Sequence, residues 1–288
     1  MANLYWKPKI WWKNQSSFGT LPTFADTDSI IGVVSFSADV ETEVIEKYSS
    51  LLQFLDIVKL SEVQLKASIK CKVTKELWEG KIKDILQVGG FGLSNTIYGS
   101  ANTLGSSTAE TYGAVLFDID GFQFAIKNAR ANSIKFGKNK NSVMEFQTDV
   151  TGDLVTSGLT FPNYSVYAGT PITTANLSGK INYWSSWEIE VSNEFYDQRD
   201  HSSGAHKLML VKTEANVRFD YDAGVYASWG LLIEPGTAVD GTLLLNGLSN
   251  DKVVFSGKLV QPALLKERDG VASQEIQAKL TSLACYHG

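Results

Sequence analysis

Apolar and polar residues alternate along several long stretches of this 288-residue chain, and this alternation is what most constrains its fold. The longest stretch covers residues 63–73, where Leu65, Ala67, Ile69 and Cys71 are separated by polar side chains. Successive side chains of a β-strand point to opposite faces, so the pattern predicts a strand with one buried face. Shorter runs of the same kind lie at residues 187–191, 207–211, 215–219 and 275–280. The chain is therefore predicted to be mainly β.

Two segments have the apolar spacing of helices instead. The first covers residues 75–86, with Thr74 as a plausible N-cap and Gly89-Gly90 at its end. The second covers residues 223–233, between Asp222 and Pro235. Each half of the chain is thus expected to carry one helix.

Turn and loop signals separate these elements. The dipeptides that favour tight turns are Asp120-Gly121, Asp240-Gly241 and Asn246-Gly247. Residues 92–111 are rich in Gly, Ser, Thr and Asn and are expected to form a long surface loop.

The two halves of the chain have similar patterns. Residues 35–44 resemble residues 186–195, and each segment is followed by a long alternating strand, a helix, a hairpin and a closing strand. Residues 143–148 and 274–280 are the expected closing strands. We expect an N-terminal arm (1–27), a first β domain (28–156), a linker (157–175) and a second β domain (176–288).

Composition excludes several classes of protein. The net charge of −5 is the wrong sign for a protein that grips nucleic acid through Lys and Arg, although a mildly acidic surface also serves ordinary solubility. The two cysteines, Cys71 and Cys285, are too few for a disulfide framework, and we expect both to stay reduced. The N-terminus has no signal-peptide pattern, and no apolar run is long enough to cross a membrane.

No sequence motif indicates catalysis or a cofactor. His201 and His206 could be imagined as metal ligands, but no second His or Cys cluster completes a site. Asp118 and Asp120 are better explained by a strand and its turn than as a catalytic carboxyl pair. The chain is predicted not to be an enzyme and to need no cofactor or metal.

Aromatic residues gather near the N-terminus, at Trp6, Trp11 and Trp12, and again around Trp184 and Trp187. They could form a carbohydrate-binding platform, or they could pack against a neighbouring subunit, since aromatic side chains are enriched in interface cores. The second interpretation is favoured, because exposed Trp residues at a terminus would be a liability.

Several segments, taken in order, resemble the major tail (tail tube) proteins of tailed bacteriophages. Residues 18–23 (Phe-Gly-Thr-Leu-Pro-Thr) are similar to the family's start. The helix ending in Gly-Gly-Phe at residues 89–91, the segment 120–134 and the strand ending at residues 144–152 also match. Asn128 and Ala131 stand where glycine is usual, and Ser192 replaces a glycine in the turn-like segment 189–193.

The resemblance implies two tandem tail-tube-like β-sandwich or half-barrel domains, each with one flanking α-helix, that contribute strands to a shared inner β-barrel. Its function would be structural: stacked rings form the tail tube, a conduit for DNA ejection. The expected location is the virion tail, after synthesis in the host cytoplasm. The expected partners are other copies of the chain, the tail terminator, tape measure and distal tail proteins, and DNA that passes without adhering; no membrane is expected.

Physical reasoning supports an oligomer independently. A barrel of sixteen to eighteen strands leaves only a modest channel, so one chain cannot enclose a duplex. A duplicated subunit therefore favours a trimeric ring with pseudo-sixfold symmetry, with a hexamer as the second choice. Strands facing the channel should expose Asp, Glu and small polar residues. The residues nominated for assembly contacts are Trp6, Trp11, Trp12, Phe18, Tyr48, Leu51, Phe54, Phe195 and Tyr196.

Two alternatives remain open at this stage. One is a carbohydrate-binding β-sandwich that serves as an adhesion module, and the other, less favoured, is a glycoside hydrolase.

Overall fold

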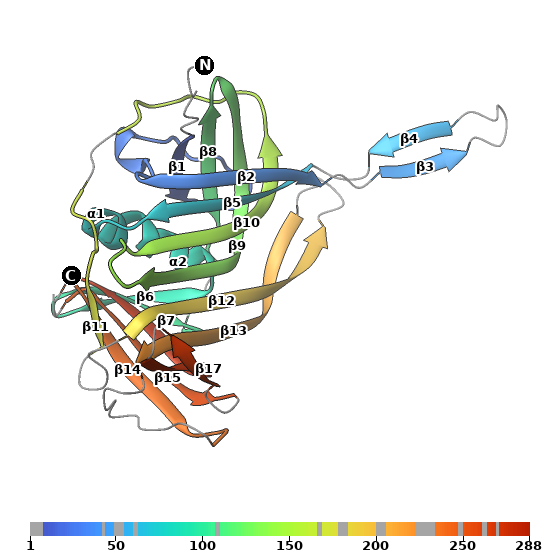
Figure 1. The fold of residues 1–288 in the computed structure, drawn as a ribbon. Helices are drawn as coiled ribbons and strands as arrows, with labels where there is room; N and C mark the ends of the chain where they lie inside the picture. Colours follow the sequence, from blue (N-terminus) through green and yellow to red (C-terminus); the bar gives the residue numbers. More distant parts are fainter. Residues whose placement is uncertain are drawn as a thin grey trace, which may run out of the picture.

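The computed structural model describes residues 8–41, 44–48, 55–59, 63–106, 110–165, 169–177, 184–199, 206–222, 234–246, 250–260, 264–268 and 271–288. The fold is mainly β and is built on one large, open antiparallel sheet (Figure 1). The strands of the N-terminal half are β1 (Lys9–Asn14), β2 (Val33–Glu41), β3 (Val44–Tyr48), β4 (Leu55–Lys59), β5 (Gln64–Lys72), β6 (Phe91–Thr96), β7 (Gly99–Leu104), β8 (Gly113–Ile119), β9 (Phe122–Asn139) and β10 (Glu145–Val155). Those of the C-terminal half are β11 (Ala175–Leu177), β12 (Trp184–Arg199), β13 (His206–Asp222), β14 (Ala238–Leu245), β15 (Lys252–Leu259), β16 (Leu264–Arg268) and β17 (Val271–His287).

The sheet contains the same strand order twice. The first series runs β1-β8-β9-β10-β5-β2, and the second runs β11-β14-β15-β17-β13-β12. Both are antiparallel throughout, and the pairing of β9 with β12 joins them into one continuous sheet. The strands β2 and β12 hold the same place in the two series; β2 contains residues 35–41 of the first similar segment, and β12 contains the whole second segment, 186–195.

Local irregularities repeat as well. β2 has a register shift between Val33 and Ser35 where it pairs with β5, and β12 has one between Trp184 and Ser186 where it pairs with β13. Within the described ranges, β3 and β4 pair with each other alone, and they project away from the main sheet (Figure 1).

One helical segment covers a face of the sheet. It consists of α1 (Lys75–Leu77), a π-helical turn (Trp78–Ile82) and α2 (Lys83–Val88), and a short 3-10 helix lies at Asp26–Asp28. The hydroxyl of Thr74 accepts a hydrogen bond from the Leu77 N–H at 3.2 Å, which confirms the predicted N-cap. The second predicted helix, residues 223–233, lies outside the described residues.

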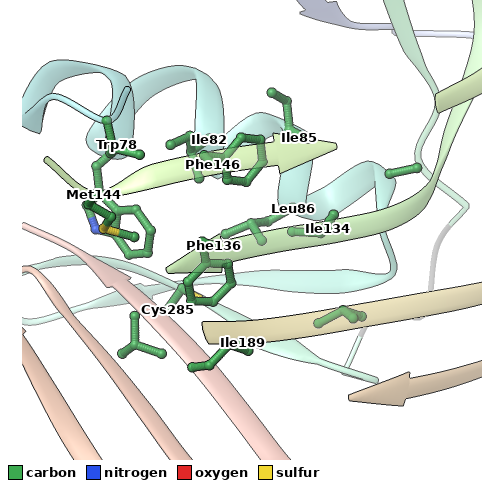
Figure 2. Close-up of a cluster of buried hydrophobic side chains, with 14 of the residues drawn as sticks. Trp78, Ile82, Ile85, Leu86, Ile134, Phe136, Met144, Phe146, Ile189 and Cys285 are labelled. Carbon is green, nitrogen blue, oxygen red and sulfur yellow. The ribbon is translucent and has the colours of Figure 1, made fainter. Parts of the chain in front are cut away.

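Figure 2 shows how this helical segment closes the core. Trp78, Ile82, Ile85 and Leu86 form its buried face, as predicted, and contact the sheet around Phe136, Phe146 and Ile189. The Trp78 indole N–H donates to the carbonyl oxygen of Tyr286 at 2.9 Å. The main core cluster draws residues from both series of strands, so the halves share one hydrophobic core.

Two turn and loop predictions were wrong. Most of segment 92–111 is not a surface loop: β6 and β7 form a hairpin, and β7 pairs with the end of β17. Asp240-Gly241 does not form the predicted turn but lies inside β14. Val239 and Leu243, on either side of it, are both buried in the core and hold this segment in the sheet. The turns at Asp120-Gly121 and Asn246 are confirmed, with φ of +51° at Asp120 and +50° at Asn246.

The predicted linker contacts the N-terminal half closely where it is described. Leu159, Phe161 and Tyr164 pack around Trp11 in a second, smaller core cluster. Ile172 reaches the main core. Cys71 and Cys285 are both buried free thiols, as expected.

Candidate assembly surface

The tryptophans nominated for assembly are core residues of their own chain. Trp11 and Trp12 are 1% and 0% exposed, and β1 is covered on both faces. Trp11 lies in the second cluster, whereas Trp12 lies in the main core, against Gly113, where an added Cβ would meet its ring at 2.7 Å. The expectation that they dock on a neighbouring subunit is therefore corrected: they hold the N-terminal segment to the sheet.

The other nominated residues fall into three groups. Phe18 and Tyr196 are 38% and 62% exposed and remain accessible. Phe195 is half-buried, with its ring 5.0 Å from the Arg130 guanidinium, and Tyr112 connects Arg130 to Phe18 through ring contacts. Trp6, Leu51 and Phe54 lie outside the described residues, and Tyr48 is described only as part of the β3 backbone.

The face of the sheet turned away from the helix is polar and rich in ion pairs between strands. Lys70 of β5 contacts Glu145 of β10 at 2.8 Å, Lys135 of β9 contacts Glu188 of β12 at 2.9 Å, and Arg218 of β13 contacts Glu275 of β17 at 2.7 Å. These side chains alternate with core residues along their strands, which places them on one face.

A second set of charges continues the pattern on this face. Glu214 accepts from Lys212 at 2.9 Å and from Lys279 at 3.0 Å. These hydrogen bonds lower the pKa of Glu214, and the hydrogen bond to Glu214 raises the pKa of Lys212. Glu214 thus pairs with a cation of its own strand, Lys212 of β13, and with one of the neighbouring strand, Lys279 of β17.

A groove of about 390 Å³ crosses the polar face where the two series meet. Lys70, Lys135, Arg218 and Glu188 line it, together with Trp187. Trp187 is only 2% exposed, so it cannot offer a flat aromatic surface to a sugar ring.

The two ends of the repeated sheet differ in what covers them. In the second series, Trp187, Ile189 and Val191 of β12 are at most 2% exposed, because β9 lies alongside. The corresponding β2 residues are Phe36, Ala38 and Val40, of which Phe36 is half-buried and Val40 is 52% exposed. Among the described residues, β2 pairs only with β5, and β16 pairs only with β17. Sequence patterns missed these edges, although the similarity of 35–44 to 186–195 was the signal that could have found them.

The described residues contain no group of three or more His, Cys, Asp or Glu side chains arranged to hold a metal ion. His201 lies outside them, and His206 is described only by its backbone. His287 is buried against the Trp78 ring, and burial lowers its pKa to about 3. Asp118 accepts the Gly121 N–H at 3.1 Å and contacts Lys9, as expected for a residue that supports a turn.

In the part of the chain that the structure describes, no helix has the length and apolar character needed to cross a membrane. No protein-family model matches the chain, and no curated protein matches it either.

Proposed function

We propose that this chain is a virion structural protein of a tailed bacteriophage that assembles into stacked rings and forms the tail tube, through which DNA is ejected. The observation that carries the proposal is the twofold repetition of one six-strand order within a single open sheet. An open sheet with unpaired edge strands is prone to add further strands, and closure into a ring removes those edges.

The repeat also favours the number of copies. Each series contributes four adjacent long strands, β2, β5, β10 and β9 in the first and their counterparts in the second. Six such units from three chains give about two dozen strands, beyond the size at which a barrel leaves only a modest channel. A trimer with pseudo-sixfold symmetry is therefore proposed, and an open channel wide enough for a duplex follows from it.

The polar face suits the inner wall of such a channel. Non-specific binding to DNA depends on Lys and Arg side chains that are free to neutralise phosphates. On this face Lys70, Lys135 and Arg218 are already paired with carboxylates. Passing DNA would meet, at these three positions, cations that are already paired, and this would weaken its adhesion to the wall.

Negative-stain microscopy of the purified chain, combined with light scattering after gel filtration, tests the proposal. Rings or tubes with a central hole and a mass of three chains per ring are expected. Monomers at every concentration would refute it. If those monomers bound glycans, and Trp184→Ala abolished binding, an adhesion module would be the better assignment.

A further inference from the structure

Among the described residues, the two six-strand series are joined by one strand pairing, that of β9 with β12. β12 pairs antiparallel with the second part of β9, from Ser186 opposite Asn139 to Ser192 opposite Ser133. The first part of β9 pairs with β8, and β10 lies along the other side of both parts. The edge strand of the second series, β12, thus pairs with β9 of the first series.

The second series has a matching acceptor strand, β16, which pairs with β17 on one side and with no described strand on the other. β15 and β16 follow one another along β17 as the two parts of β9 follow one another along β10. β15 pairs with β14, as the first part of β9 pairs with β8. β16 is therefore the counterpart of the β9 segment that receives β12.

We infer that β2 of one copy pairs antiparallel with β16 of the next copy, in the same register that β12 takes on β9. This inference rests on the proposed ring and names the strands that close it. The matching bulges make Ser35 the counterpart of Ser186, and the pairings through β5, β10 and β17 make Lys266 the counterpart of Gly137. Because Glu188 lies opposite Gly137, the expected pairs are Ser35 with Arg268, Ser37 with Lys266 and Asp39 with Leu264.

The exposed apolar side chains of β2 support a second copy as the occupant. Val191 is completely buried beside β9, whereas its counterpart Val40 is 52% exposed. In the inferred register Val40 directly follows Asp39, which lies opposite Leu264 at the start of β16, so a strand from another copy would end beside it. An apolar edge strand left open in this way would be an aggregation risk.

Charge complementarity points the same way. β2 carries Asp39 and Glu41 and no cation, while β16 carries Lys266 and Arg268 beside a single Glu267. The joint within the chain has the same polarity, with Lys135 on β9 and Glu188 and Glu190 on β12. Opposite charges on adjacent strands stabilise pairing, and like charges oppose it.

The edges formed by β2 and β16 are different surfaces, so the contact between copies is head to tail. Repeated contacts of this kind form either a closed ring or an open filament. A head-to-tail contact can be tested by mixing two single variants. We would prepare Ser37→Cys and Lys266→Cys, leaving Cys71 and Cys285 in place because both are buried. Residues directly opposite in an antiparallel pair lie about 4.5–5.5 Å apart at Cα, within the range that a disulfide spans.

After mild oxidation with copper phenanthroline, only the mixture should give a disulfide-linked dimer, and neither variant alone should. The double variant should give a covalent ladder that ends at three chains. Glu267→Cys, one residue out of register, is the matched control and should not link to Ser37→Cys. The pair Ser35→Cys and Arg268→Cys tests the same register if a Lys266 variant folds poorly.

The outcomes separate this inference from the proposed function. Rings that form without the cross-link, or that link equally well through Glu267→Cys, would overturn the β2–β16 register and leave the ring intact. Linkage of Ser37→Cys to itself would show a symmetric contact and also overturn it. Absence of any self-association would remove both.

Discussion

Val40→Lys is the sharpest single-residue perturbation of the inferred joint. Val40 is 52% exposed in the isolated chain, so a lysine there can extend into water, and the stability of the monomer should hardly change. In the assembled ring the same position is expected to be covered, as Val191 is within the chain. The substitution should therefore act on assembly and not on folding.

The expected magnitude follows from the exposed fraction. Full burial of a valine side chain stabilises by about 1.5–3 kcal/mol, so the exposed half of Val40 should contribute about 1 kcal/mol on assembly. Covering an unpaired lysine adds a penalty of about 2 kcal/mol or more, even where its ammonium group reaches the rim. The sum, about 3 kcal/mol per joint, corresponds to a pairwise affinity lower by a factor on the order of 100.

Sedimentation velocity over a concentration series measures this shift directly. Leu93→Lys is the control, because Leu93 is 44% exposed on β6, away from both inferred edges. It should assemble like the unmodified chain, while Val40→Lys should stay monomeric up to much higher concentrations. At a concentration low enough for both to be monomeric, Val40→Lys and the unmodified chain should have the same thermal midpoint. If both variants assembled equally well, β2 would not lie in an interface, and the reasoning from its counterpart Val191 would be wrong.

Three further predictions concern a buried histidine, a half-buried amide and the polar face. Because burial lowers the pKa of His287 from 6.5 to about 3, the unfolded chain takes up a proton there that the folded chain does not. The unfolding free energy should then fall below about pH 6.5, by up to about 1.4 kcal/mol per pH unit for this group, and urea titrations at about pH 7.5 and 5.5 should show a smaller loss for His287→Phe. Asn193 donates to the carbonyl oxygens of Gly89 at 3.0 Å and Ala131 at 2.8 Å, and accepts from Thr213 at 2.8 Å. Asn193→Asp removes both donors and should lower the urea-derived stability by about 2–3 kcal/mol. Finally, the triple variant E145Q/E188Q/E275Q should bind a duplex oligonucleotide at low salt in fluorescence anisotropy, and D120N/E234Q/D240N, with the same change in net charge, should not.

The elements that the sequence predicted well are those whose signal is local and periodic. β5 appears where the alternation of residues 63–73 placed a strand, and the helical segment begins after Thr74 as its capping pattern indicated. Period-two and period-3.6 patterns arise directly from which side of an element is buried, so they survive without knowledge of the partner. The hairpin at Asp120-Gly121 is equally local, because both residues adopt positive φ.

The errors occurred where burial depends on distant segments. Trp11 and Trp12 are adjacent, and both are buried because the sheet core covers one face of β1 and the 159–164 segment covers the other. An isolated aromatic cluster does not reveal two such covers, so it suggested an exposed arm. The β6–β7 hairpin was missed for a related reason: its Ser, Thr and Gly residues are typical of loops, and it is held as strand by the pairing of β7 with β17.

The edges proposed for assembly could be located only by combining the two kinds of information. Sequence similarity aligned residues 35–44 with 186–195, and the strand pairing gave both segments the same place and the same bulge. Among the described residues, β12 has a neighbouring strand on each side and β2 has one on a single side, so a covered and an uncovered copy of the same strand can be compared within one chain. An isolated β2 would read as an ordinary edge strand, since exposed valines occur singly on many surfaces. Val191 is fully buried and its counterpart Val40 is not, which suggests that β2 takes a neighbouring strand in the assembled protein. β16 is the strand of the second series that corresponds to the part of β9 beside β12.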